Sequence, residues 1–192
     1  MNKPNGYEDT YIGGDFIPVN VGGHTATIIG LEETTSKAGK PMVKIAIDFD
    51  DNDAQAAYFM EMFQADDRPD KKWPFNAVQY ILTEDANGKC SRSFKSFISS
   101  VERSNNSECV WGKGFADWFK GKKIGVVYGL VEEEYNGKVS SRRRIRYFCQ
   151  YDKAKDASIP EPKLLDNNNN TRTTLNEGFM DVSEVKADYI PF

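Results

Sequence analysis

The feature that most constrains the fold is a pair of β-rich segments, residues 123–135 and 138–151, joined by Asn136-Gly137. The first segment is rich in β-branched side chains. An Asn-Gly pair between two such segments is the strongest short-range signal for a hairpin, because both residues tolerate positive φ. The second segment carries a dense basic run, residues 142–146. The sequence therefore predicts a long antiparallel hairpin near the end of a β-rich domain.

Shorter segments ahead of this hairpin complete a small, mostly β domain. The predicted strands are residues 25–33, 42–49, 57–63 and 77–83. Residues 42–49 alternate apolar and polar side chains, which is typical of a half-buried strand. A helix is predicted over residues 91–103, because Phe94, Phe97, Ile98 and Val101 share one helical face and belong to the core. A second short helix is predicted over residues 115–119.

Short strands, a helical insertion and a closing hairpin are the arrangement of the OB-fold, a five-stranded, partly open barrel. The predicted fold class is therefore mainly β: an OB-fold-like five-stranded barrel with a helical insertion, plus a disordered C-terminal tail. The tail is predicted because the Asn-rich sequence after Pro160 and Pro162 has too little apolar surface to offset chain entropy. The predicted parts are an N-terminal arm (1–20), the barrel (21–158), a flexible acidic linker (159–185) and a terminal tip (186–192).

Charge is distributed unevenly along the chain. The formal net charge is −4, but residues 161–192 hold six acids and only three bases, so the rest of the chain is close to neutral. Salt screens charges beyond about 8–10 Å, so a local basic stripe decides which ligand binds. The overall acidity therefore does not exclude a nucleic-acid partner.

Several classes of protein are disfavoured by what the sequence lacks. No apolar run reaches the roughly 20 residues of a membrane span, and the first residues lack the apolar stretch of a signal peptide, so we expect a cytoplasmic protein without membrane partners. Cys90, Cys109, Cys149 and the single histidine, His24, match no zinc spacing, so no metal or other cofactor is expected. No phosphate-binding loop or nucleophile motif is present, which favours a non-enzymatic protein.

The hairpin carries the first candidate binding residues. Strand alternation places Arg142, Arg144, Arg146 and Phe148 on one face of the second strand. Cations for phosphates and flat rings for bases are what single-strand binding requires. The alternative interpretation is that Glu132, Glu133 and Glu134, across the hairpin, neutralise these arginines in cross-strand pairs.

Further candidates lie outside the basic run. They are Lys44, Tyr58, Lys71, Lys72, Trp73 and Tyr135. Trp73 is the foremost of them, because it follows two lysines in a proline-bearing loop, and a stacked base contributes about 1–3 kcal/mol. Its alternative role is to cap the core beneath that loop.

The chain ends in Asp188-Tyr189-Ile190-Pro191-Phe192. Apolar residues beside a free carboxylate, tethered by a polar linker, make a suitable docking peptide: Phe192 can fill a pocket, and Pro191 lowers the ordering cost. The alternative is that these residues pack on the chain's own core. The pattern predicts a partner-binding tip.

This ending resembles the acidic tip of bacterial single-stranded-DNA-binding proteins, matching at Asp188 and at Ile190, Pro191 and Phe192; Tyr189 stands in place of an acid. Residues 30–34 (Gly-Leu-Glu-Glu-Thr) and 120–127 (Lys-Gly-Lys-Lys-Ile-Gly-Val-Val) are similar to replication-module proteins from phages of Gram-positive bacteria. The resemblance spans most of residues 20–165. It implies an OB-type fold that binds single-stranded DNA, in the host-cell cytoplasm, and a tip that recruits repair and replication enzymes.

The leading hypothesis is therefore a non-enzymatic protein that coats single-stranded DNA, without strong sequence preference, in phage replication or recombination. Two other classes stay open: a protein–protein adaptor that does not itself bind DNA, and a structural virion component. A homo-oligomer is compatible with either, since an exposed edge strand can form a seam between copies.

Overall fold

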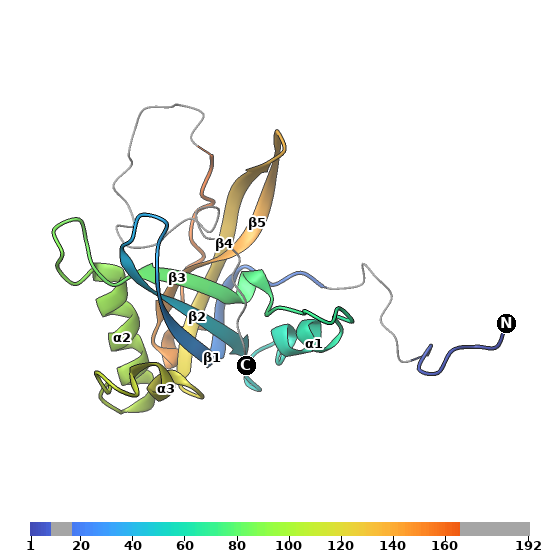
Figure 1. The fold of residues 1–192 in the computed structure, drawn as a ribbon, viewed down its shortest axis with the longest axis horizontal. Helices are drawn as coiled ribbons and strands as arrows, with labels where there is room; N and C mark the ends of the chain where they lie inside the picture. Colours follow the sequence, from blue (N-terminus) through green and yellow to red (C-terminus); the bar gives the residue numbers. More distant parts are fainter. Residues whose placement is uncertain (9–16, 166–192) are drawn as a thin grey trace.

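The computed structural model describes residues 1–8 and 17–165 (Figure 1). The strands are β1 (Gly22–Thr35), β2 (Pro41–Phe49), β3 (Val78–Leu82), β4 (Lys123–Tyr135) and β5 (Lys138–Cys149). The helices are α1 (Tyr58–Gln64), α2 (Arg92–Asn105) and α3 (Phe115–Phe119), with short 3₁₀ turns η1 (Phe75–Ala77) and η2 (Tyr151–Lys153). None of the helices in these ranges is long and apolar enough to cross a membrane.

The five strands form one antiparallel sheet in the order β3-β2-β1-β4-β5. This is a partly open barrel of the OB type, with β1 shared between β2 and β4 and with the gap lying between β3 and β5. A bulge between Ile28 and Gly30 lets β1 bend enough to pair with both neighbours. The Tyr128 hydroxyl of β4 donates to the Asn76 carbonyl of η1, the turn that leads into β3, at 2.7 Å. The predicted mainly β, OB-like fold is confirmed.

Helix α2 lies between β3 and β4 in sequence, as the predicted insertion requires. Ser91 begins it: the serine hydroxyl accepts the Phe94 N–H at 3.1 Å, a helix N-cap. Its apolar face, Phe94, Phe97, Ile98 and Val101, is buried against the barrel, which confirms the core prediction. Helix α3 forms where predicted and packs against β1, and α2 and α3 lie on the same side of the molecule (Figure 1).

The segment predicted as a third strand, residues 57–63, is instead helix α1. Ala57 stands at its N-cap in the left-handed conformation (φ 54°) and offers no side-chain cap. The cap comes from β2, because the Asp48 carboxylate accepts the Phe59 N–H at 2.9 Å. Burial raises the pKa of Asp48, against the lowering effect of its backbone hydrogen bonds. A contact between segments so far apart is not visible in local sequence.

Strand β2 is buried on both faces rather than one. The expected inward set is buried, but so are Lys44, Ala46 and Asp48 of the alternate face. Helix α1 and the loop that follows it contribute cover for that alternate face. The half-buried interpretation of residues 42–49 is therefore wrong, although the strand itself is confirmed.

A buried pair fixes the start of β1 to the turn after β2. The Nδ1 of His24 lies 3.0 Å from the Asp53 carboxylate, and its Nε2 lies 3.0 Å from the Asn20 carbonyl. The same carboxylate accepts the N–H groups of Thr25 and Gln55. Burial favours the neutral acid, but the hydrogen bond from His24, those backbone groups and the His24 charge outweigh it, so the pKa of Asp53 lies below its usual value.

The β4–β5 hairpin is longer than the barrel needs. Its turn is Asn136-Gly137, with φ values of 51° and 73°, as the Asn-Gly signal predicts. Strand β1 begins opposite Tyr128, so the outer half of β4 has no partner in β1. That half projects beyond the barrel with β5 (Figure 1).

Residues 158–165 occupy part of the edge that β1 leaves open, and we call this segment the strap. Lys163 bonds in parallel register beside Val131: its N–H donates to the Leu130 carbonyl, and its carbonyl accepts the Glu132 N–H, both at 2.9 Å. Gly129 permits the approach, since a Cβ there would meet the Pro160 ring at 2.7 Å. The flexible linker was predicted to begin at residue 159, but residues 159–165 lie against β4.

Candidate nucleic-acid interface

One face of the projecting hairpin gathers cations and an aromatic ring. Residues paired directly across an antiparallel ladder share a face. The pairs Tyr135–Lys138, Val131–Arg142 and Gly129–Arg144 therefore place Tyr135, Lys138, Arg142 and Arg144 together, and we call this the basic face. The Tyr135 ring is 75 % exposed, and Lys138 and Arg142 are exposed. Neither cation has an ion pair within the described residues.

Arg144 is the cation of the basic face with an ion pair and a ring contact among the described residues. Its Nε and Nη2 donate to the two oxygens of Glu133 at 2.6 and 2.8 Å, a bidentate pair. The same guanidinium lies over the Phe75 ring, 4.7 Å from its centre, and Phe75 is 46 % exposed. The side chains of Arg144 and Glu133 are 18 % and 30 % exposed, so the pair is partly shielded from solvent.

The basic face does not extend to Arg146 and Phe148 as predicted. A bulge makes Tyr128 oppose Ile145 and Val127 oppose Tyr147, so Arg146 is an extra residue that interrupts the alternation. Phe148 consequently turns inward, where it is 7 % exposed and packs on Phe97 with ring centres 5.2 Å apart.

Arg146 holds the strap instead of lying free on the surface. Its Nη1 donates to the Glu161 carbonyl at 2.8 Å and to the Leu130 carbonyl at 3.3 Å. The nearby Tyr147 hydroxyl donates to the Ser158 carbonyl at 3.3 Å. The second strand of the hairpin thus divides into an outer part that forms the basic face and an inner part that binds the chain's own backbone.

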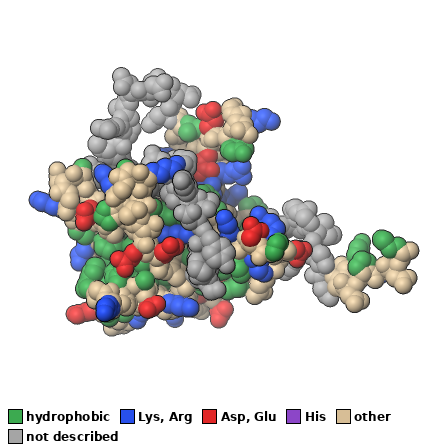
Figure 2. Space-filling model, viewed as in Figure 1, with side chains coloured by type: hydrophobic (Ala, Val, Ile, Leu, Met, Phe, Trp, Pro, Cys, Tyr) green, Lys and Arg blue, Asp and Glu red, His purple; other side chains and the backbone are tan. Residues whose placement is uncertain are grey.

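The alternative interpretation was that the glutamates of β4 neutralise the arginines of β5. This pairing occurs at one position. Glu133 pairs with Arg144, whereas Glu132 accepts the Leu165 N–H of the strap at 3.1 Å, and Glu134 is exposed on the opposite face, across from Val139. Basic and acidic side chains are interspersed on the projecting hairpin (Figure 2). With one acid against three bases, the basic face keeps a net positive charge.

Tyr58, another predicted site residue, begins α1 and packs beside Phe49 and Phe59, with ring centres 6.2 and 5.0 Å apart. Burial raises the pKa of this partly buried tyrosine, and the positive charge of Arg143 opposes the shift. The Nε of Arg143 is buried and has no acceptor among the described residues. Arg143 and Arg144 therefore lie on opposite faces of the hairpin, across from Leu130 and Gly129.

The remaining predicted cations are separate from the basic face. Lys44 is 6 % exposed, and its Nζ lies 3.4 Å from the Glu32 carboxylate across the β1–β2 ladder. Lys71 lies over the Phe63 ring, 4.9 Å from its centre, and Lys72 is exposed. Lys72 is the one lysine of these three placed to meet a ligand without rearrangement.

Trp73, the foremost predicted aromatic, is part of the core. It is 6 % exposed, and its indole N–H donates to the Ile47 carbonyl at 3.2 Å. Its ring packs beside Phe63, with centres 5.5 Å apart. The prediction that Trp73 offers a stacking face is therefore wrong, and its alternative role as a cap on the core describes it. The predicted partner-binding tip, Asp188 to Phe192, lies outside the described residues.

Phe75 is the site residue that the sequence prediction missed. It follows Pro74, two positions after the tryptophan, and it is the exposed ring of this loop where Trp73 is the buried one. The loop composition signalled an aromatic beside lysines, but only the fold of η1 against β5 decides which ring faces outward.

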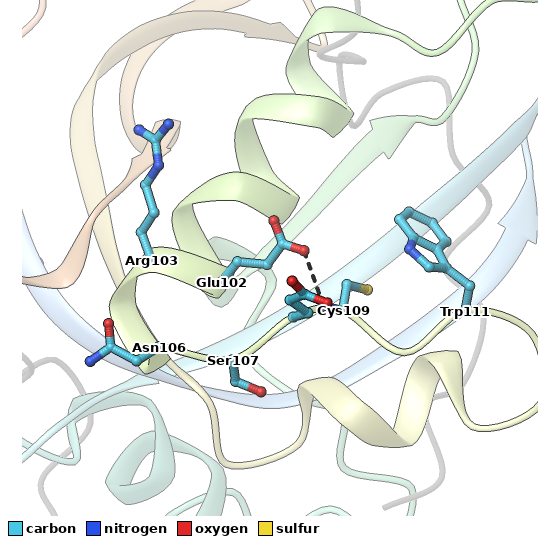
Figure 3. Close-up of a pocket in the computed structure, with 7 residues that line it drawn as sticks. Glu102, Arg103, Asn106, Ser107, Cys109 and Trp111 are labelled. Atoms are coloured by element: carbon cyan, nitrogen blue, oxygen red, sulfur yellow. Dashed lines mark hydrogen bonds between the residues drawn. The ribbon is translucent and has the colours of Figure 1, made fainter.

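A hollow of about 470 Å³ lies away from the hairpin, between the end of α2 and the loop that follows it (Figure 3). Glu102 and Cys109 lie within it, and the glutamate accepts the Cys109 N–H at 3.0 Å. Burial, and then the charge of Glu102, raise the pKa of the Cys109 thiol to about 11. A reactive cysteine requires the opposite shift, so this hollow does not have the chemistry of a thiol nucleophile. No group of three metal-ligating side chains occurs in residues 1–8 and 17–165.

No protein-family model matches the sequence, and no curated protein matches it.

Proposed function

We propose that this protein binds single-stranded DNA without strong sequence preference and that the β4–β5 hairpin is its principal contact. The observation that carries the proposal is the basic face, where Tyr135, Lys138 and Arg142 are exposed together on a projecting arm of an OB-type barrel. Such barrels bind single strands by combining a cationic groove with rings that stack on bases.

The chemistry of the basic face suits a flexible polyanion better than a duplex. Exposed cations spaced along a strand can each meet one phosphate, and the neighbouring rings offer flat faces that every base can use. An intact duplex hides its bases in the stack, so aromatic contacts would be lost on it. We therefore expect preference for single strands and little preference among sequences.

The role in phage replication or recombination, and partner recruitment through Asp188 to Phe192, rest on the resemblances in the sequence. In this proposal the barrel holds exposed DNA while the terminal residues dock to a replication or recombination enzyme. The protein itself performs no chemistry.

The test is a titration of fluorescently labelled oligo-dT at 50 and 200 mM salt, with an equal length of duplex as competitor. We expect tight binding at low salt, marked weakening at high salt and poor competition by duplex. Absence of binding at 50 mM salt would instead favour a protein–protein adaptor, and equal affinity for duplex would remove the preference for single strands.

A further inference from the structure

The contacts around Phe75 form a layered arrangement at the hairpin root. Glu133 accepts from the Nε–Nη2 edge of Arg144, and Arg144 lies on the Phe75 ring. A guanidinium fixed by a bidentate carboxylate has little freedom to rotate away. The ring is nevertheless 46 % exposed, so part of it remains open to solvent while the arginine lies against it.

Phe75 differs from a singly exposed apolar residue in its position, because it contacts Arg144 of the basic face while part of its surface stays available to a ligand. The backbone that carries Phe75 is anchored to the barrel. Phe75 begins η1, whose Asn76 carbonyl accepts the Tyr128 hydroxyl, and this hydrogen bond ties the turn to the barrel. The ring is thus held rigidly beside the basic face.

We propose that Phe75 is a stacking platform for a nucleobase and that Glu133 is a positioning residue, which promotes binding by holding Arg144 against the ring. The inference rests on the proposed function and adds to it a specific platform and a specific role for an acid. A base stacks on the open part of the ring, while Arg144 stays paired with Glu133 and packs against the rest of the ring.

The change in DNA affinity on neutralising Glu133 distinguishes two roles for this residue. As a simple anion it repels DNA, so its neutralisation would strengthen binding and release Arg144 for a new phosphate contact. As a positioning residue it does the reverse: neutralisation loosens Arg144 and the platform, and binding weakens even though the protein becomes less negative. The two accounts therefore predict opposite changes for one substitution.

The experiment compares Glu133→Gln with Glu134→Gln in oligo-dT titrations of the full chain. Both substitutions remove one negative charge from the same strand of the hairpin, but Glu134 lies on the opposite face and is exposed. We expect Glu134→Gln to leave affinity unchanged or slightly stronger and Glu133→Gln to weaken it about threefold, part of the roughly fivefold or more that one stacked base contributes. The salt slope should stay that of the wild type in Glu133→Gln, whereas a released Arg144 would steepen it by about 0.7.

A second variant, Phe75→Leu, tests the platform itself. We expect it to weaken binding about fivefold or more, since a leucine retains apolar bulk but offers no flat face. In the Phe75→Leu background, Glu133→Gln should have no further effect, because its role passes through that ring. If Glu133→Gln instead strengthens binding, behaves like Glu134→Gln or weakens binding equally in both backgrounds, the inference is wrong. A wild-type protein that binds no oligo-dT would refute the proposed function itself, a separate outcome.

Discussion

The sharpest prediction concerns the two unpaired cations of the basic face, Lys138 and Arg142. Replacing both with alanine should remove two phosphate contacts. On single strands each contact contributes about 0.7 to the slope of log affinity against log salt, so the slope should become shallower by about 1.4. Between 50 and 200 mM salt, a fourfold range, the wild type should therefore lose about seven times more affinity than the double variant.

The measurement is fluorescence anisotropy of labelled oligo-dT at four or more salt concentrations within that range. Both side chains are exposed and form no ion pair within the described residues, so their removal should leave the unfolding midpoint in urea unchanged.

The matched control is Lys89→Ala with Lys120→Ala, which removes two exposed positive charges from loops outside the hairpin. It should lower affinity only slightly and keep the wild-type slope. An unchanged slope in the hairpin variant would refute the assignment of the basic face. An equal change in the control would show that net charge, rather than this face, determines binding.

Four further predictions concern stability and the tail. Trp73→Phe should lower the free energy of unfolding in urea by about 1–3 kcal/mol, because it removes the buried hydrogen bond from the indole N–H to the Ile47 carbonyl, while oligo-dT affinity stays constant. Because the pKa of Asp53 is lowered in the fold, its contribution to stability is present above about pH 4 and lost as pH falls further; Asp53→Asn should reduce that acid dependence in thermal melts. A chain ending at Ala157 should show faster amide exchange at Glu132 than one ending at Leu165. Deleting Asp188 to Phe192 should leave oligo-dT affinity unchanged or slightly higher at low salt; a loss would mean that these residues belong to the fold.

The elements that the sequence predicted correctly are those specified by local chemistry. Asn136-Gly137 determines the hairpin turn, because few other residue pairs accept its two positive φ values. The three-four spacing of the α2 core residues likewise needs no knowledge of the rest of the chain. Such signals were sufficient for the positions of all five strands and for the OB-like arrangement, although they also predicted a strand at residues 57–63, which form α1.

The errors arise where one segment supplies what another lacks. Helix α1 has Ala57 at its N-cap, and the missing acceptor is Asp48 of β2. The prolines of the strap suggested a linker. Pro160 nevertheless fits against Gly129, and the hydrogen bonds to β4 are formed by Lys163 and not by Pro162, which has no N–H to donate. Both outcomes depend on contacts between distant parts of the sequence.

The candidate site was only partly predictable for the same reason. Alternation correctly grouped Arg142 with Arg144, but a single extra residue, Arg146, reverses the orientation of everything after it. Trp73 is buried and Phe75 is exposed because of the path that their loop takes over β2. Composition identified the correct kinds of side chain, and the fold determined which of them face solvent.

Strand β1 begins opposite Tyr128, and this position determines which part of the hairpin can change in length. Beyond that point the outer hairpin shares no ladder with the barrel other than the strap at Val131. Removing or adding two opposed pairs at a time between Glu133 and Ser140 would preserve the facing of the remaining side chains and leave the core intact. Ligand contact and barrel stability can therefore be altered separately, so the hairpin behaves as an exchangeable module on a constant scaffold.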